Sequence, residues 1–201
     1  HLSLRRQRQM CIRDRCNNTI TIKGSTETVK TLWDESQKED SGLLQAMKPM
    51  PKELDGTTSP APKEGVPQPL VDGFDNWYDW RVKNWGTKWE MDIEGLEYTD
   101  NGDGTSSIIG WADSAWGPPI DAFQTFADDM DGCYLELKFW ESGMDFIGVW
   151  DSEGGDAYYD DVSDMVRKDD TWKEDTVLYE LVGDFGLEEH FDEMDQEEEM
   201  A

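Results

Sequence analysis

Residues 118–150 read PPIDAFQTFADDMDGCYLELKFWESGMDFIGVW, and this stretch decides the fold. Its first part predicts a helix, because Pro118 and Pro119 suit the first turn, where a missing N–H costs little. Gly132 ends that helix. The apolar spacing predicts a buried helical stripe that consists of Ile120, Phe123, Phe126, Ala127 and Met130.

The second part of the same stretch predicts a β-hairpin. Apolar residues alternate with polar ones at Cys133, Leu135, Leu137 and Phe139, the period of a half-buried strand. A turn follows at Ser142-Gly143, and residues 144–150 run back as the partner strand. A helix that leads into an antiparallel hairpin indicates an α+β fold.

The flanking sequence adds elements of the same kinds. Residues 18–23 alternate as a strand, and Ser25 caps a helix whose apolar stripe contains Val29, Leu32 and Trp33. A helix is predicted over 76–85, where Gly86 closes it, and a hairpin follows: a strand over 87–98 with a β-bulge at Gly95, a turn over 99–105 and a strand over 106–112. Toward the C-terminus the predicted elements are an extension of the antiparallel strands over 157–162, a strand or helix over 176–182 and a short helix over 185–191.

This order of elements predicts one α+β domain over residues 16–183. We expect a ferredoxin-like antiparallel sheet with helices on one face. Residues 48–73 contain six of the eight prolines and predict a long Pro-rich loop, either functional or a lineage-specific insertion. Residues 184–201 predict a short helix and a solvated acidic C-terminal tail, because Lys and Arg are missing from 188 onward.

The first fifteen residues differ from the rest of the chain. They contain five of the 18 basic residues and a single acid. Back-translation of Met10 to Asp14 as ATG TGT ATA AGA GAC resembles the transposon end used in sequencing libraries, read in frame. We therefore interpret residues 1–15 as an adapter artefact and leave them out of the fold. A natural basic arm is the alternative.

Composition excludes several classes of protein. The formal net charge is −28, which argues against a protein that binds duplex phosphates. No apolar run has the length of a membrane span, and no signal peptide is recognisable. Without the adapter only Cys16 and Cys133 remain, so reduced thiols and a cytoplasmic protein are expected. The 10 Trp, 7 Phe and 6 Tyr supply a core despite few aliphatic residues.

Catalytic and metal-binding motifs are not recognisable in the sequence. Outside the adapter, His190 is the only histidine, and no Gly-rich phosphate loop is present. With so many acids, adjacent carboxylates carry little information, although a metal enzyme that uses paired carboxylates is a third hypothesis. We expect a protein that is not an enzyme and that has no cofactor and no metal.

Tryptophan is the concentrated feature. Six tryptophans fall between residues 77 and 116. One interpretation is core packing. The other is a groove that stacks bases or holds a proline-rich peptide. The candidate groove residues are Trp80, Asn84, Trp85, Lys88 and Trp116.

The same segments carry a family resemblance. The pieces are Cys16-Asn17-Asn18, residues 50–54 (MPKEL), Tyr78-Asp79-Trp80, residues 84–89 (NWGTKW) and residues 115–119 (AWGPP). With the acidic-aromatic hairpin over 135–150, they make residues 16 to about 161 resemble the YubB-type ferredoxin-like proteins of phages and plasmids. Arg15 stands where family members often have Trp. The resemblance implies a mobile-element gene and a ferredoxin-like shape, and it implies no activity.

Two hypotheses about function follow. The first is a non-enzymatic accessory protein of a phage or plasmid that binds a host or viral protein, because an acidic surface attracts basic partners. A decoy of a nucleic-acid-binding protein is its stronger form. The alternative is a module that binds a small ligand or single-stranded nucleic acid in the tryptophan groove.

Overall fold

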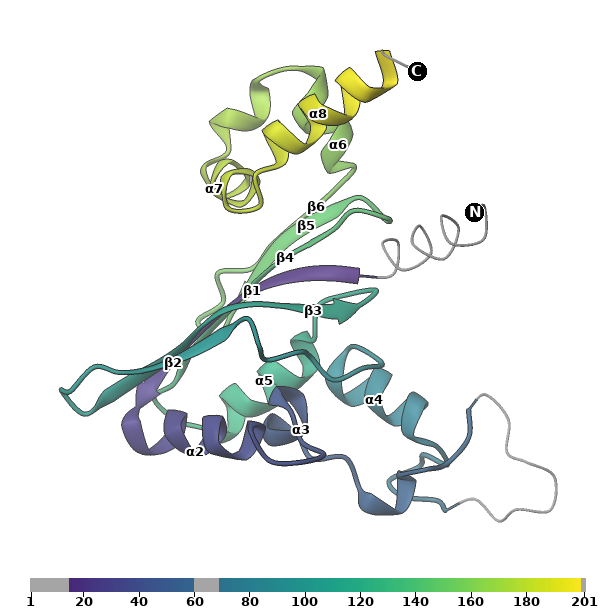
Figure 1. The fold of residues 1–201 in the computed structure, drawn as a ribbon, viewed down its shortest axis with the longest axis vertical. Coiled ribbons are helices and arrows are strands. Elements are labelled where there is room, and N and C mark those ends of the chain that lie inside the picture. Colours follow the sequence, from purple (N-terminus) through teal and green to yellow (C-terminus); the bar gives the residue numbers. More distant parts are fainter. Residues whose placement is uncertain (1–14, 60–68, 200–201) are drawn as a thin grey trace.

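A computed structural model describes residues 15–59 and 69–199 of the chain (Figure 1). The described residues form an α+β fold with one six-stranded antiparallel sheet and seven α-helices, which confirms the predicted class. The predicted adapter lies outside the described residues except for Arg15, which begins the first strand opposite Ala115.

The sheet has the strand order β2-β3-β1-β4-β5-β6, and every neighbouring pair is antiparallel. Ile20 in the central strand lies opposite Gly110 on one side and Leu137 on the other. The strands are β1 Arg15–Ser25, β2 Leu96–Asp100, β3 Thr105–Ala115, β4 Tyr134–Glu141, β5 Phe146–Asp151 and β6 Ala157–Asp160.

Four helices cover one face of the sheet, called here the inner face: α2 Thr26–Ser36, α3 Leu43–Met47, α4 Trp77–Trp85 and α5 Ile120–Asp129 (Figure 1). They form the first core with the alternate strand residues that point inward, such as Ile20 and Ile22. Phe123 and Phe126 are buried in that core, as the spacing predicts. Met130 is exposed because it caps the end of α5, so its place in the buried stripe was wrong.

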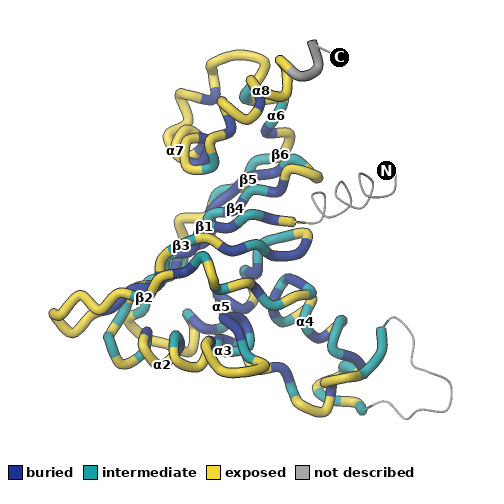
Figure 2. The backbone as a smooth tube through the Cα atoms, in the orientation of Figure 1, coloured by how far each residue is buried: buried dark blue, intermediate teal, exposed yellow. Residues whose placement is uncertain are grey.

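The remaining helices lie on the outer face, and this overturns the prediction of helices on one face. They are α6 Val162–Lys168, α7 Thr176–Asp184 and α8 Leu187–Glu199. A second core joins them to Ile147 and Val149 of β5. Strand β5 is therefore buried on both faces, which explains why it lacks a polar alternation (Figure 2).

The short helix predicted over 185–191 corresponds to the start of α8, which continues through the acidic segment to Glu199 where a tail was predicted. Residues 192–196 are exposed, as expected for the acidic segment. Leu187 and Phe191 are buried in the second core. They lie four residues apart, so both sit on one face of α8 while carboxylates occupy the exposed face. The run of acidic residues after Phe191 gave no signal for the continuation of the helix to Glu199.

The strand predicted over 87–98 is wrong for residues 87–95, and the loop predicted over 48–73 contains short regular elements. Residues 87–95 are irregular, and β2 begins only at Leu96. The Pro-rich segment contains a short 3-10 helix, η1 Lys52–Leu54, and a bridge between Val71 and Phe74, whereas residues 60–68 lie outside the described residues. A second 3-10 helix, η2 Thr171–Glu174, precedes α7. In the described part of the chain, no helix combines the length and apolar character that a membrane span requires.

Candidate functional site

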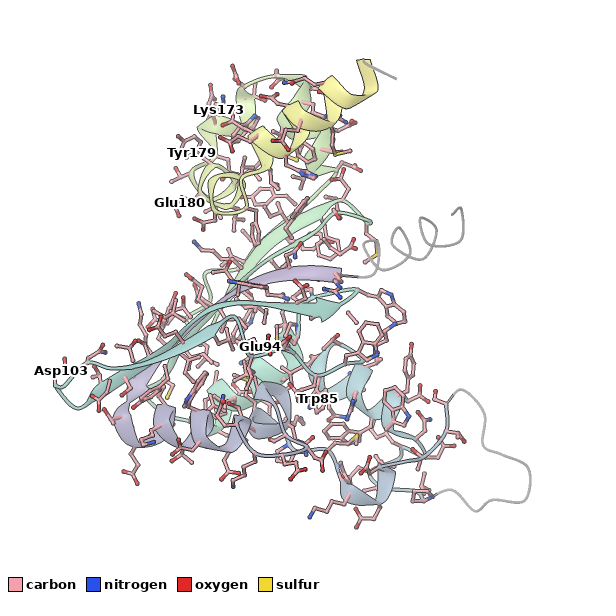
Figure 3. The ribbon with its side chains drawn as sticks, in the orientation of Figure 1. Trp85, Glu94, Asp103, Lys173, Tyr179 and Glu180 are labelled. Atoms are coloured by element: carbon pink, nitrogen blue, oxygen red, sulfur yellow. The ribbon has the colours of Figure 1, made fainter. Side chains whose placement is uncertain are left out.

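Two tryptophans of α4, Trp80 and Trp85, are core residues. Trp80 is 4% exposed and Trp85 is fully buried, and their rings pack edge to face at 5.9 Å. Trp85, labelled in Figure 3, donates its indole Nε1–H to the carbonyl of Lys48 at 2.8 Å. The Asn84 amide donates to the carbonyl of Trp80 in the same helix. The groove interpretation is therefore wrong for Trp80 and Trp85, and core packing explains them.

The other two candidate residues, Lys88 and Trp116, meet at the surface. The Lys88 Nζ lies 3.4 Å from the centre of the Trp116 ring and 4.1 Å from that of Trp89. Trp116 has a φ of +67°, a left-handed conformation that is uncommon for a bulky residue. The Ser114 hydroxyl donates to the carbonyl of Gly117 at 2.7 Å, and this bond spans the turn that contains Trp116. Two exposed indoles thus already hold an ammonium group between them.

Trp111 is the exposed residue that the sequence interpretation did not select. It points from β3 to the outer face and is 66% exposed, and Ile109 on the same face is 45% exposed. The alternation of β3 carries the signal, because the neighbours Ile108 and Ala112 are buried. The helices α6–α8 cover the β5 side of this face, so β3 displays a large indole to solvent.

A cavity of about 470 Å³ opens beside Trp111, where the segment 87–95 departs from β3. The segment leaves β3 at Gly95, whose carbonyl accepts from the Trp111 N–H at 3.2 Å. It returns at Thr87, whose hydroxyl bonds both backbone groups of Ala115. We call this cavity the tryptophan pocket. Its lining residues are Arg15, Trp89, Glu90, Asp92, Glu94, Gly95, Trp111, Ala112, Asp113, Ser114 and Ala115.

Gly95 sets the position of the Trp111 indole. A Cβ at residue 95 would lie 2.4 Å from the Trp111 carbonyl and 2.9 Å from its ring. Across the ladder, Gly110 approaches equally closely, since a Cβ there would lie 2.1 Å from the Gly95 carbonyl. Two glycines therefore let the backbone of the segment 87–95 approach β3 and the Trp111 indole closely beside the pocket.

The carboxylates of the pocket have different structural roles. Burial raises the pKa of Glu90, and three backbone N–H groups, from Leu44, Gln45 and Met91, hold its oxygens. That carboxylate caps α3 and so fixes the segment 87–95 to the helical layer. Asp92 and Glu94 are exposed, and Asp113 is half-buried. These three leave a negative wall that faces the indoles.

A second cavity of about 450 Å³ lies on the other side of Trp111, toward the C-terminal helices. Trp140 and Phe185 line it, with ring centres 6.3 Å apart. Trp111 and Asp113 line both cavities. Trp111 thus lies between the two cavities on the exposed part of the outer face.

Cys16 belongs to a buried polar cluster and not to the surface. Its burial raises the pKa of the thiol, which keeps the sulfur protonated and unreactive. The amide of neighbouring Asn18 donates to the carbonyls of Cys16 and Ala112 and to the Ser114 hydroxyl. This cluster ties β1 to β3. Within residues 15–59 and 69–199, no group of three His, Cys, Asp or Glu side chains is arranged to hold a metal ion.

Comparison with protein-family models, with curated proteins and with solved structures finds no match for this chain. The resemblance to YubB-type proteins therefore stays a prediction.

Proposed function

We propose that this protein is a non-enzymatic binding protein that recognises a basic segment of a host or viral protein through the open part of its outer sheet face. The observation that carries the proposal is the exposed Trp111, which projects from β3 between two cavities. Large exposed apolar side chains that gather on one face mark interaction sites. Tryptophan is also enriched among residues that dominate binding energy.

Charge favours a basic partner over a nucleic acid. The chain has 46 acidic and 18 basic residues. On the open face Asp113 adjoins Trp111, and the ammonium of Lys138 is paired with Asp184 at 2.5 Å. An acidic surface steers basic partners toward it and repels phosphates. A basic nucleic-acid-binding protein is one such partner, for which this protein would serve as a decoy.

The proposal includes an origin and a fold family. The order β2-β3-β1-β4, with helices between β1 and β2 and between β3 and β4, supports a ferredoxin-like unit to which β5, β6 and α6–α8 are added. With the resemblance to YubB-type proteins, this supports an accessory gene of a phage or plasmid and action in the bacterial cytoplasm.

Single-stranded nucleic acid is the second candidate, because a ferredoxin-like sheet can stack bases on exposed aromatic residues. Trp111 on the central part of the sheet favours it. The carboxylates beside Trp111 oppose it, since they would meet phosphate groups.

Selection from a random peptide library tests the proposal. The full chain is the bait at physiological salt, and calorimetry then measures the affinity of synthesised peptides for a double variant, Ile109→Ala with Trp111→Ala. Met165→Ala with Tyr179→Ala is the matched control, since it removes two exposed residues from α6 and α7. A thymidine oligonucleotide is titrated in parallel.

We expect the selected peptides to be rich in Arg and Lys and to lose at least tenfold in affinity for the face variant only, about 1.4 kcal/mol. Equal binding to both double variants would overturn the proposal. Oligonucleotide binding that the face variant abolishes would replace it with the nucleic-acid candidate.

A further inference from the structure

We infer that the tryptophan pocket binds an arginine side chain of the basic partner. This inference rests on the proposed function and adds the ligand group and the subsite. The pocket offers two indoles, Trp89 and Trp111, and a wall of carboxylates, Asp92, Glu94 and Asp113. A guanidinium group fits both, because it stacks on aromatic rings and bonds carboxylates through a planar fork.

A guanidinium already meets Asp113 at the edge of the pocket, although it belongs to Arg15, the last residue of the segment interpreted as an adapter. The Arg15 Nη1 donates to the Asp113 Oδ2 at 3.0 Å, and the Asn17 amide donates to the Asp113 Oδ1 at 2.8 Å. Asn17 thus holds the carboxylate in the orientation that a guanidinium meets. Arg15 itself is exposed, so an arginine from another chain can displace it.

The indoles of this surface also accept a cation. Trp89 forms one wall of the pocket, and the Lys88 ammonium lies 4.1 Å from its ring centre. Lys88 contacts Trp89 and Trp116. Of the three exposed indoles Trp89, Trp111 and Trp116, Trp111 is the one over which no cation of the described residues lies. An incoming guanidinium would occupy that position.

Arginine suits this pocket better than lysine. An ammonium is compact and strongly hydrated, whereas a guanidinium is weakly hydrated and planar. The cavity of about 470 Å³ admits an arginine side chain with its stem. Gly95 lies against one part of the Trp111 ring, and the indole is 66% exposed, so it still offers surface for stacking.

The test uses the full chain and three blocked peptides of one length, which carry arginine, lysine or neutral citrulline. Calorimetry at low ionic strength gives the affinities. The pocket variants are Trp89→Ala and the triple variant Asp92→Asn, Glu94→Gln and Asp113→Asn. A triple variant on the exposed face of α8, Glu189→Gln, Asp192→Asn and Glu193→Gln, removes the same charge.

We expect the arginine peptide to bind at least tenfold more tightly than the citrulline peptide and more tightly than the lysine peptide. Each pocket variant should weaken it about tenfold, the size of a desolvated cation–π contact or a charged hydrogen bond. The α8 variant should lose far less. Arg15→Gln should bind at least as tightly as the parent chain, because it frees Asp113.

A spectrum of the indole N–H signals provides a readout that does not depend on how the variants fold. The Trp89 and Trp111 signals should shift with the arginine peptide and not with the citrulline peptide. Equal losses in the pocket and α8 triple variants, or shifts confined to other indoles, would overturn the inference. If library peptides still lose affinity for the double variant Ile109→Ala with Trp111→Ala while the pocket variants bind normally, the inference fails and the proposed function stands. If no basic peptide binds, both fail.

Discussion

The hydroxyl of Thr87 bonds both backbone groups of Ala115. It donates to the carbonyl and lies at 3.0 Å from the N–H as well. Thr87 is buried, so no water replaces these bonds. This one side chain fastens the far end of the segment 87–95 to β3 and thereby closes the tryptophan pocket.

Thr87→Val removes those bonds and keeps the shape of the side chain. We expect the free energy of unfolding to fall by about 2 kcal/mol, because a buried N–H and carbonyl lose a partner. Thr87→Ser keeps the hydroxyl and should lose clearly less. Urea denaturation measures both. Equal losses in the two variants would mean that the methyl contact and not the hydroxyl closes the pocket.

The left-handed backbone at Trp116 predicts an inverted order of substitutions. Glycine normally destabilises relative to alanine, but a φ of +67° is strained for any residue with a Cβ. Trp116→Gly should therefore be more stable than Trp116→Ala by about 1 kcal/mol. Both lose the contact with the Lys88 ammonium, so the comparison cancels it. Thermal unfolding of the pair decides the matter, and a more stable alanine variant would contradict the argument.

Glu90 predicts an unusual response to pH. Burial raises the pKa of its carboxyl in the folded state, so the folded state binds this proton more tightly than the unfolded chain does. Its contribution to stability is present at low pH and is lost as pH rises through the folded-state pKa. It is complete below the ordinary glutamate pKa of about 4.3.

Glu90→Gln removes that titration and isolates it from the other carboxylates. The stability of the parent chain relative to Glu90→Gln should rise as pH falls, by about 1.4 kcal/mol for each unit of pKa difference. Urea denaturation at a series of pH values measures the difference. A constant difference, or one that grows with pH, would mean that the three backbone N–H groups outweigh burial.

Local sequence signals predicted much of the fold. Strand β4 and the inward Ile20 and Ile22 follow strict alternation. Helix α4 follows the prediction over 76–85 and ends at Gly86, which has the left-handed conformation. In these elements the apolar period and the residues at the helix ends are sufficient to predict the structure, because the tertiary contacts only reinforce the local preference.

The candidate site was harder to predict, because long-range contacts decide it. Residues 87–95 alternate like a strand, but the Glu90 carboxylate turns to cap α3, whose Leu44 is 46 positions away in the sequence. Composition did not distinguish the buried Trp85 from the exposed Trp111. The alternation of buried and exposed residues around Trp111 would have predicted its exposure. The groove was instead placed at the sequence motif around Trp85.

The last prediction concerns α8, whose acidic sequence suggested a tail. Phe191 is buried in the second core, whereas Met194 on the same helix is exposed. Phe191→Ala should lower the free energy of unfolding of the α6–α8 lobe by about 3 kcal/mol, the cost of a large cavity. Met194→Ala should change it by less than about 0.5 kcal/mol. Hydrogen exchange followed residue by residue measures the lobe separately from the first core. If α8 were a solvated tail, its amides would exchange at once in the parent chain and neither substitution would matter. Fast exchange of the α6 and α7 amides in Phe191→Ala would instead show that α8 keeps these helices packed on the outer face of β5.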